Sequence, residues 1–250
     1  EDPAGKYFAI LSYVQVGAQE QIMLTFINED GSFNGVSRFA NDTLSVFPSK
    51  FVVGAHPDTF LVTGQYTDAN KNNDGFYAEL PKATGKPTFA FTVGSASYET
   101  LNAVAVTPKG YALAGVFVDA TTTRDRAWLL SIDAAGGIIS DFGYSGNGTG
   151  DEQANAVFVP PAGGLLLAGS TSTWGAGLAD MWTLRLNAAG GITFNAASAA
   201  TRTATGFARA ALGLNAVTGT MLNSVATTVT RAAPAEVVST PGFAQNQQAP

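Results

Sequence analysis

The chain has 250 residues, a formal net charge of −6 at pH 7 and no cysteine, so disulfides, thiolate metal sites and a cysteine nucleophile are excluded. Lys and Arg number only 13, which argues against a nucleic-acid binder. No apolar run approaches the roughly 18 residues of a membrane-spanning helix, so the chain is not expected to span a membrane. Its polarity comes mainly from Asn, Thr, Ser, Gln and Gly, which is typical of a turn-rich β protein and favours a secreted or cell-surface location.

One segment that alternates apolar and polar residues and ends in a glycine turn recurs along the chain. The copies read IMLTFINEDG (22–31), FYAELPKATG (76–85), WLLSIDAAGG (128–137), WTLRLNAAGG (182–191) and, more weakly, PAEVVSTPG (234–242). The turn glycines Gly31, Gly85, Gly136, Gly190 and Gly242 are 51–54 residues apart. An alternation with period two predicts strands with one apolar face.

A second segment recurs between these copies and has the pattern of a hairpin whose second strand ends in a small residue. It reads FVVGAHPDTFLVTG (51–64), NAVAVTPKGYALAG (102–115), NAVFVPPAGGLLLAG (155–169) and RAALGLNAVTGTMLNS (209–224), and GKYFAILS (5–12) matches its second strand. The last residues of these copies are Ser12, Gly64, Gly115, Gly169 and Ser224, which are 51–55 residues apart. Two separate landmarks therefore keep the same period.

A period of about fifty residues with about four strands per unit predicts a β-propeller. The predicted fold is all-β, a single domain over residues 1–250 with five blades of about 52 residues each. We place the blades at residues 6–41, 48–94, 100–146, 153–199 and 206–250. The first blade lacks its inner strand, and an open strand position can accept a strand from another chain.

The better-preserved units are similar to a known family. The segments AWLLSIDAAGGI (127–138), DMWTLRLNAAGGI (180–192) and DEQANAVFVPPAGGLLLAGSTST (151–173) resemble bacterial β-propeller repeats of the SBBP and delta-60 type. The resemblance is strongest over 100–192. It implies a propeller in a secreted or cell-surface bacterial protein that acts as a scaffold or adhesion module, and it does not specify a ligand.

Two acidic residues are candidates for ligand binding or acid–base chemistry. Glu99 and Glu152 occupy equivalent repeat positions, so they are expected on neighbouring blades near one mouth of the channel. A pair of carboxylates could hydrolyse or bind a glycan. The alternative is that both acids belong to the repeat and stabilise the turn that leads into each inner strand.

The loop DANKNNDG (68–75) is a candidate calcium site. Asp68, Asn70, Asn72 and Asp74 alternate as oxygen donors, which are the ligands that calcium prefers. The loop resembles the start of an EF-hand loop, but its glycine comes late and no glutamate follows at the usual distance. The alternative is a solvated Asn/Asp turn.

Trp174 stands outside the repeat pattern, whereas His56 aligns with Thr107 of the next blade, at the end of the inner strand. Trp174 lies in a glycine-rich loop and is a candidate contact residue for a ligand. His56 is the only histidine, and without a recognisable partner we interpret it as a polar turn residue. By contrast, Trp128, Trp182 and Phe76 share one repeat position and are predicted to pack between blades.

The sequence therefore favours a non-enzymatic scaffold that binds other protein subunits or itself, and its incomplete terminal blades offer a means of self-assembly. The alternative is a five-bladed lectin or glycoside hydrolase with a glycan as its ligand. No cofactor is predicted other than calcium.

Overall fold

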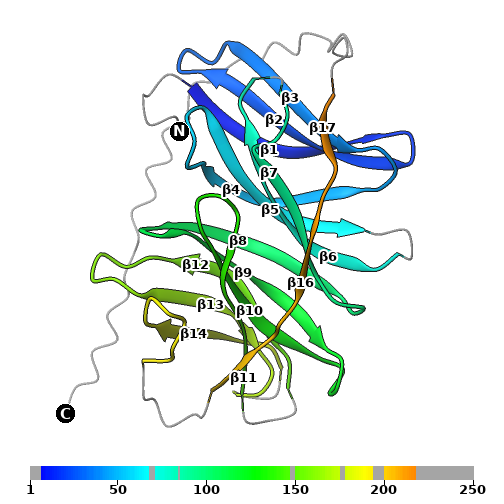
Figure 1. Ribbon diagram of the computed structural model, residues 1–250. Helices are drawn as coiled ribbons and strands as arrows, with labels where there is room; N and C mark the ends of the chain where they lie inside the picture. Colours follow the sequence, from blue (N-terminus) through cyan, green and yellow to red (C-terminus); the bar gives the residue numbers. More distant parts are fainter. Residues whose placement is uncertain are drawn as a thin grey trace, which may run out of the picture. The chain divides into compact units, whose positions relative to one another are not determined.

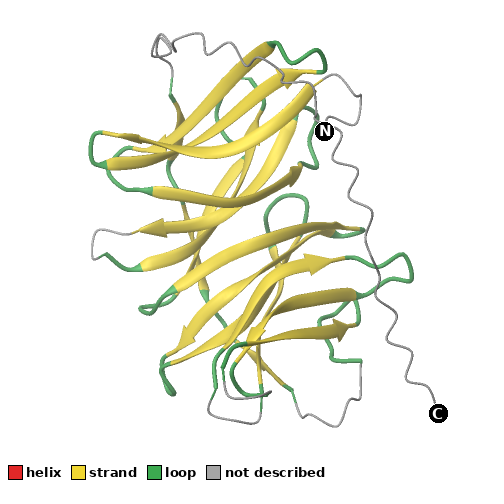
Figure 2. Ribbon diagram, turned by 180° about the vertical axis from the view of Figure 1, so that it is seen from behind, coloured by secondary structure: helices red, strands yellow, loops and turns green. Residues whose placement is uncertain are grey.

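The computed structural model describes residues 7–67, 71–83, 85–146, 150–174, 178–193 and 200–217. Within these ranges the chain forms strands β1 to β17 and no helix, which confirms the predicted all-β class. The described chain accordingly has no long apolar helix of the kind that crosses a membrane. Figure 2 shows the strands without interruption by any other regular structure.

The strands form four antiparallel sheets, which we number along the chain (Figure 1). Sheet 1 contains β1 (Tyr7–Val16), β2 (Gln19–Asn28), β3 (Phe33–Asn41) and β17 (Leu214–Ala216). Sheet 2 contains β4 (Val46–Val53), β5 (Thr59–Thr67), β6 (Asn73–Pro81), β7 (Phe89–Gly94) and β16 (Ala208–Ala211). Sheet 3 contains β8 (Glu99–Thr107), β9 (Gly110–Asp119), β10 (Arg124–Ile132), β11 (Ile138–Ser145) and β15 (Thr201–Ala204). Sheet 4 contains β12 (Glu152–Phe158), β13 (Leu165–Thr171) and β14 (Asp180–Leu186).

The predicted hairpins at 51–64, 102–115 and 155–169 form the first two strands of sheets 2, 3 and 4. The glycine-turn segments at 22–31, 76–85, 128–137 and 182–191 begin in the strand that pairs with the second strand of each hairpin or its counterpart in sheet 1, which is β2, β6, β10 or β14. The turn glycines Gly31, Gly136 and Gly190 have φ angles of 83°, 80° and 76°, a left-handed conformation that glycine adopts without strain. Sheet 1 starts at β1, so no described strand lies where β4, β8 and β12 lie in the later sheets.

The residues placed in the first part of a fifth blade are arranged differently from the prediction. Residues 201–217, which we call the edge segment, supply β15, β16 and β17 as short outer strands of sheets 3, 2 and 1 in turn. Figure 1 shows this segment in orange, crossing the three sheets. Strand addition to free sheet edges satisfies its backbone hydrogen bonds without a sheet of its own. The remainder of the predicted blade, including 234–242, lies outside the described residues.

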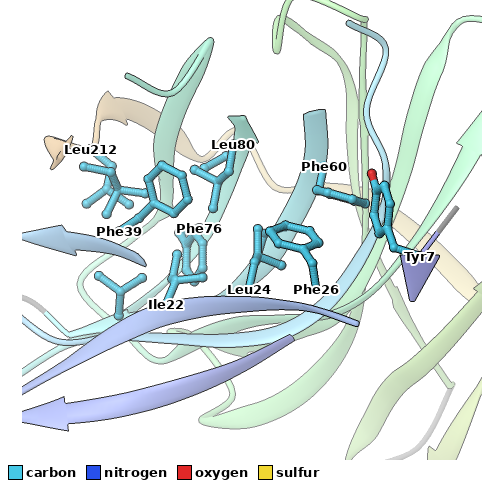
Figure 3. Close-up of a cluster of buried hydrophobic side chains, with 13 residues drawn as sticks. Tyr7, Ile22, Leu24, Phe26, Phe39, Phe60, Phe76, Leu80 and Leu212 are labelled. Carbon is cyan, nitrogen blue, oxygen red and sulfur yellow. The ribbon is translucent and has the colours of Figure 1, made fainter. Parts of the chain in front are cut away.

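A few side chains anchor the edge segment. The ring of Phe207 packs edge-on against Phe117 and Trp128, with centroids 5.2 and 5.3 Å away. Leu212 and Leu214 are buried in the core between sheets 1 and 2, where Figure 3 shows Leu212 beside Phe39. The apolar pattern that predicted a hairpin here instead serves to dock the segment.

The sheets pack face to face because their middle strands are apolar on both sides. In β10, Trp128 and Leu130 face the core shared with sheet 2, whereas Ala127 and Leu129 face the core shared with sheet 4. The first strand of each later sheet lies against the sheet before it: β4 against β1 and β2, β8 against β4 to β6, and β12 against β8 to β10. Burying both faces predicts the short, continuously apolar runs seen in the sequence.

The small residue that ends each hairpin is explained by a close approach of two backbones. A Cβ atom on Gly115 would lie 1.9 Å from the carbonyl oxygen of Thr100, and one on Gly169 would lie 1.8 Å from that of Gln153. Both contacts occur beside a bulge in the first strand of the sheet. Ser12 holds the equivalent position in sheet 1, where no first strand is described and a side chain is tolerated.

Candidate functional site

Glu99 and Glu152 are the first residues of β8 and β12, and both are buried, at 0% and 1% exposure. The Glu99 carboxylate accepts hydrogen bonds from the backbone N–H and the hydroxyl of Ser95, at 3.1 and 2.5 Å. Glu152 accepts one from the Arg126 guanidinium at 3.0 Å and one from the hydroxyl of Thr173. Glu99 therefore stabilises the turn that leads into β8, as the alternative interpretation expects, whereas Glu152 connects Arg126 of β10 with Thr173 after β13.

The electrostatic surroundings of the two acids differ. Burial raises the pKa of the Glu99 carboxyl above its usual range, against the hydrogen bonds from Ser95, and the charge of Asp74 raises it further. Glu152 instead forms an ion pair with Arg126, a side chain that is only 11% exposed. Neither carboxylate faces solvent, so this arrangement offers no open pair of acids for a substrate.

The structure brings part of the predicted calcium loop to Glu99. Asp68 and Asn70 lie outside the described residues. A Cβ atom on Gly94 would be 2.7 Å from a carboxylate oxygen of Asp74 and 2.7 Å from one of Glu99, so the two acids meet there. Asn72 lies beside them and donates to the carbonyl oxygen of Ser95 at 2.9 Å. Among the described residues, no three His, Asp or Glu side chains gather in a way that could hold a metal ion.

The tryptophans fall into two groups. Trp128 and Trp182 are buried, at 0% and 9% exposure, and Phe76 is buried at the same repeat position, which confirms their predicted packing role. The indole N–H groups of both tryptophans also have acceptors: Trp128 donates to the Asp141 carboxylate and Trp182 to the carbonyl oxygen of Ser170, both at 2.7 Å. Trp174 is half-buried and lies against Gly146, so only part of its ring is free for a ligand.

Sequence reasoning missed a partner for His56. Glu79, a fully buried acid in β6, accepts hydrogen bonds from the backbone N–H of His56 at 2.9 Å and from the hydroxyl of Thr59. One of its oxygens also lies 3.0 Å from Nδ1 of His56, whose side chain is 49% exposed. His56 lines a cavity of about 310 Å³ with Tyr7 and Asp58.

This pair has a recognisable chemical use. A carboxylate that holds one imidazole nitrogen fixes the ring and leaves the other nitrogen available to a ligand. The sequence signal was an acid inside the apolar run FYAEL, at a position where β10 has Ser131 and β14 has Arg185. Because the carboxylate of Glu79 accepts hydrogen bonds from the turn between β4 and β5, its structural role is sufficient to explain its burial.

One face of sheet 1 exposes apolar side chains in a regular arrangement. This outer face of sheet 1 contains Phe8, Ile10, Met23, Thr25, Ile27, Phe33 and Val36, together with the polar Ser12 and Arg38, and the strand register places them on the side away from sheet 2. Phe8, Ile10 and Phe33 are 45%, 47% and 60% exposed. Exposed apolar surface of this kind is typical of interaction sites.

The repeat register shows how unusual this exposure is. Ser12 pairs with Met23 as Gly115 pairs with Trp128, so Ile10 is equivalent to Leu113 and Phe8 to Tyr111. Leu113 and Tyr111 are 0% and 2% exposed because sheet 2 covers them. The outer face of sheet 1 therefore has the composition of a covered face. Sequence analysis missed it because the residues of β1 are apolar on both sides, as in a strand buried on both faces.

Sheet 4 also has one face that no described sheet covers. This outer face of sheet 4 consists of Ala156, Phe158, Leu166, Ala168, Met181, Thr183 and Arg185. Met181 is 85% and Phe158 is 56% exposed. Sheets 1 and 4, the first and last in chain order, thus each have an outer face with exposed apolar side chains.

Comparison with known proteins adds no family to these observations: no protein-family model matches the sequence, and no curated protein is significantly similar to it.

Proposed function

We propose that this protein is a non-enzymatic, secreted or cell-surface scaffold whose subunits assemble with one another through the outer face of sheet 1. The stacked antiparallel sheets support a fold of the β-propeller type, with sheets 1 to 4 as blades. The described residues from 201 to 217 pair with sheets 1 to 3, so no described segment forms the predicted fifth blade.

The exposed face of sheet 1 is the observation that carries this proposal. It places half-exposed Phe8 and Ile10 where the equivalent residues of sheets 2 and 3 are covered. Burying apolar surface at about 25 cal/mol per Å² is the main driving force for protein association. A protein partner that covers this face would therefore gain hydrophobic free energy of the kind that the internal sheet contacts provide, reduced by the entropy cost of association.

The buried acids favour a scaffold over the alternative of a lectin or glycoside hydrolase. A hydrolase needs two carboxyl groups that reach the scissile bond from a cleft. Glu99 and Glu152 are instead enclosed, Glu99 by hydrogen bonds from Ser95 and Glu152 by hydrogen bonds from Arg126 and Thr173. No glycan ligand is supported by the surroundings of either residue.

Light scattering on the purified chain over a range of concentrations tests the proposal. The average mass of the wild type should rise with concentration, whereas that of Ile10→Lys should remain that of a monomer. Val106→Lys is the matched control, because Val106 is 55% exposed in β8 but lies on neither outer face. A constant monomeric mass for the wild type would refute the proposed function.

A further inference from the structure

The proposed function leaves open which surface covers sheet 1. Resting on that function, we propose that the partner is a second copy of this chain, whose outer face of sheet 4 packs against the outer face of sheet 1. The contact would repeat, between two molecules, the packing that joins consecutive sheets within one.

Every internal contact joins two different kinds of face. One kind contains the residues equivalent to Trp128 and Leu113, and it always packs on the preceding sheet. The other kind contains the residues equivalent to Leu129 and Ala114, and it always packs on the following sheet. By the strand register, sheet 1 leaves a face of the first kind uncovered and sheet 4 leaves a face of the second kind uncovered. The two open faces are therefore complementary in kind.

The outer face of sheet 4 keeps the small residues that make room for a neighbouring sheet. In sheet 3, Ala103 pairs with Ala114 directly before the hairpin glycine, and β12 and Trp182 pack on this side of the sheet. In sheet 4, Ala156 pairs with Ala168 at the same position. A close approach of a further sheet is thus possible at the same place.

The outer face of sheet 1 supplies the side chains that would enter this space. Met23 holds the position of Trp128 and Trp182, and a methionine side chain adapts to an irregular surface. Ile10 and Phe8 lie two and four register positions further along the same face, as Leu113 and Tyr111 do relative to Trp128. These apolar groups match the exposed Met181 and Phe158 of sheet 4 in character.

The symmetry of such a contact has a direct consequence. Two different surfaces meet, so each pair of molecules still has one free face of each kind. A head-to-tail contact of this type continues into rows unless its rotation closes a ring. We therefore expect assemblies larger than dimers.

Disulfide trapping tests which faces meet, and because the native sequence has no cysteine, only the introduced thiols can form disulfides. Thr25→Cys places a thiol on the outer face of sheet 1, and Thr183→Cys places one on the outer face of sheet 4. The two variants, one carrying a mass tag, are mixed and oxidised. Lys109→Cys, in the exposed turn between β8 and β9, replaces either variant as the control.

The mixed disulfide of Thr25→Cys with Thr183→Cys should form about tenfold faster than any disulfide with Lys109→Cys, because association raises the effective thiol concentration. Faster self-linking of Thr25→Cys would mean that two sheet 1 faces meet, which overturns this inference and leaves the proposed function intact. An intrachain disulfide in the Thr25→Cys/Thr183→Cys double variant would show closure within one molecule and also overturn it. If the wild type associates but the Thr25→Cys and Thr183→Cys variants link no faster than the Lys109→Cys control, the inference is also overturned, whereas failure of the wild type to associate refutes the proposed function itself.

Discussion

Truncating matched residues at one repeat position measures whether the outer face of sheet 1 is open. Leu113→Ala removes a fully buried side chain, and large-to-small changes of this kind cost about 2–5 kcal/mol in the free energy of unfolding. Ile10 is 47% exposed, so Ile10→Ala loses about half of the 1.5–3 kcal/mol of full burial and leaves no enclosed cavity. We expect a cost of about 1 kcal/mol for Ile10→Ala and about 3 kcal/mol for Leu113→Ala.

Chemical denaturation of dilute protein, at concentrations where light scattering gives a monomer, is the assay. The cost of Ile10→Ala should then increase with protein concentration, because association stabilises only the folded wild type. The cost of Leu113→Ala is already complete in the monomer. Equal costs for the two variants in dilute protein would refute the reasoning, since they would show that the same chain covers both positions.

Phe207→Ala should lower the free energy of unfolding by about 2 kcal/mol, because the half-buried ring of Phe207 docks the edge segment on sheet 3. It should also increase amide hydrogen exchange in β15, and unchanged exchange would contradict this anchoring role. Glu79→Gln should lower the free energy of unfolding by about 2 kcal/mol, measured by thermal or chemical denaturation, because hydrogen bonds to a charged acceptor are lost. His56→Ala should lower it less, because the His56 ring is half exposed and the hydrogen bond from its backbone N–H remains. The reverse order would be inconsistent with a structural role for Glu79. Burial raises the folded pKa of Glu99, so the wild type should lose stability as the pH rises from about 4.5 through that folded pKa. Melting temperatures between pH 4 and 8 should show that this loss is absent in Glu99→Gln and present in Glu152→Gln, and identical profiles would rule out the assigned cause.

The sequence predicted those parts of the fold that depend on local pattern. The shared position of Trp128 and Trp182 and the glycines after each hairpin followed from the period, and the structure gives them a common reason in packing and in close backbone approach. The edge segment could not be predicted in this way. Its apolar residues fit a hairpin equally well, and only the position of free sheet edges decides between the two.

The candidate site was less accessible to sequence reasoning. An acid at a repeat position can point to solvent or into a loop, and nothing in the neighbouring letters shows that Glu99 is enclosed. Asp74 and Glu99 were separate candidates, and the pairing of β6 with β7 brings them together. His56 and Glu79 are 23 residues apart and meet because the turn after β4 folds over β6. Contacts of this kind depend on register, which a single sequence specifies only indirectly.

The exposed face of sheet 1 shows a further limit. The apolar residues of β1 predict burial on both sides, but they do not tell whether the covering sheet belongs to the same molecule. That question needs a measurement on the assembled protein.

Electron microscopy of the purified chain at increasing concentration tests the central claim most directly. If the outer faces of sheets 1 and 4 bind one another between copies, particles should join head to tail into rows or rings, and Ile10→Lys should show only single particles. Single particles of the wild type at every concentration, or dimers related by a two-fold axis, would contradict the account.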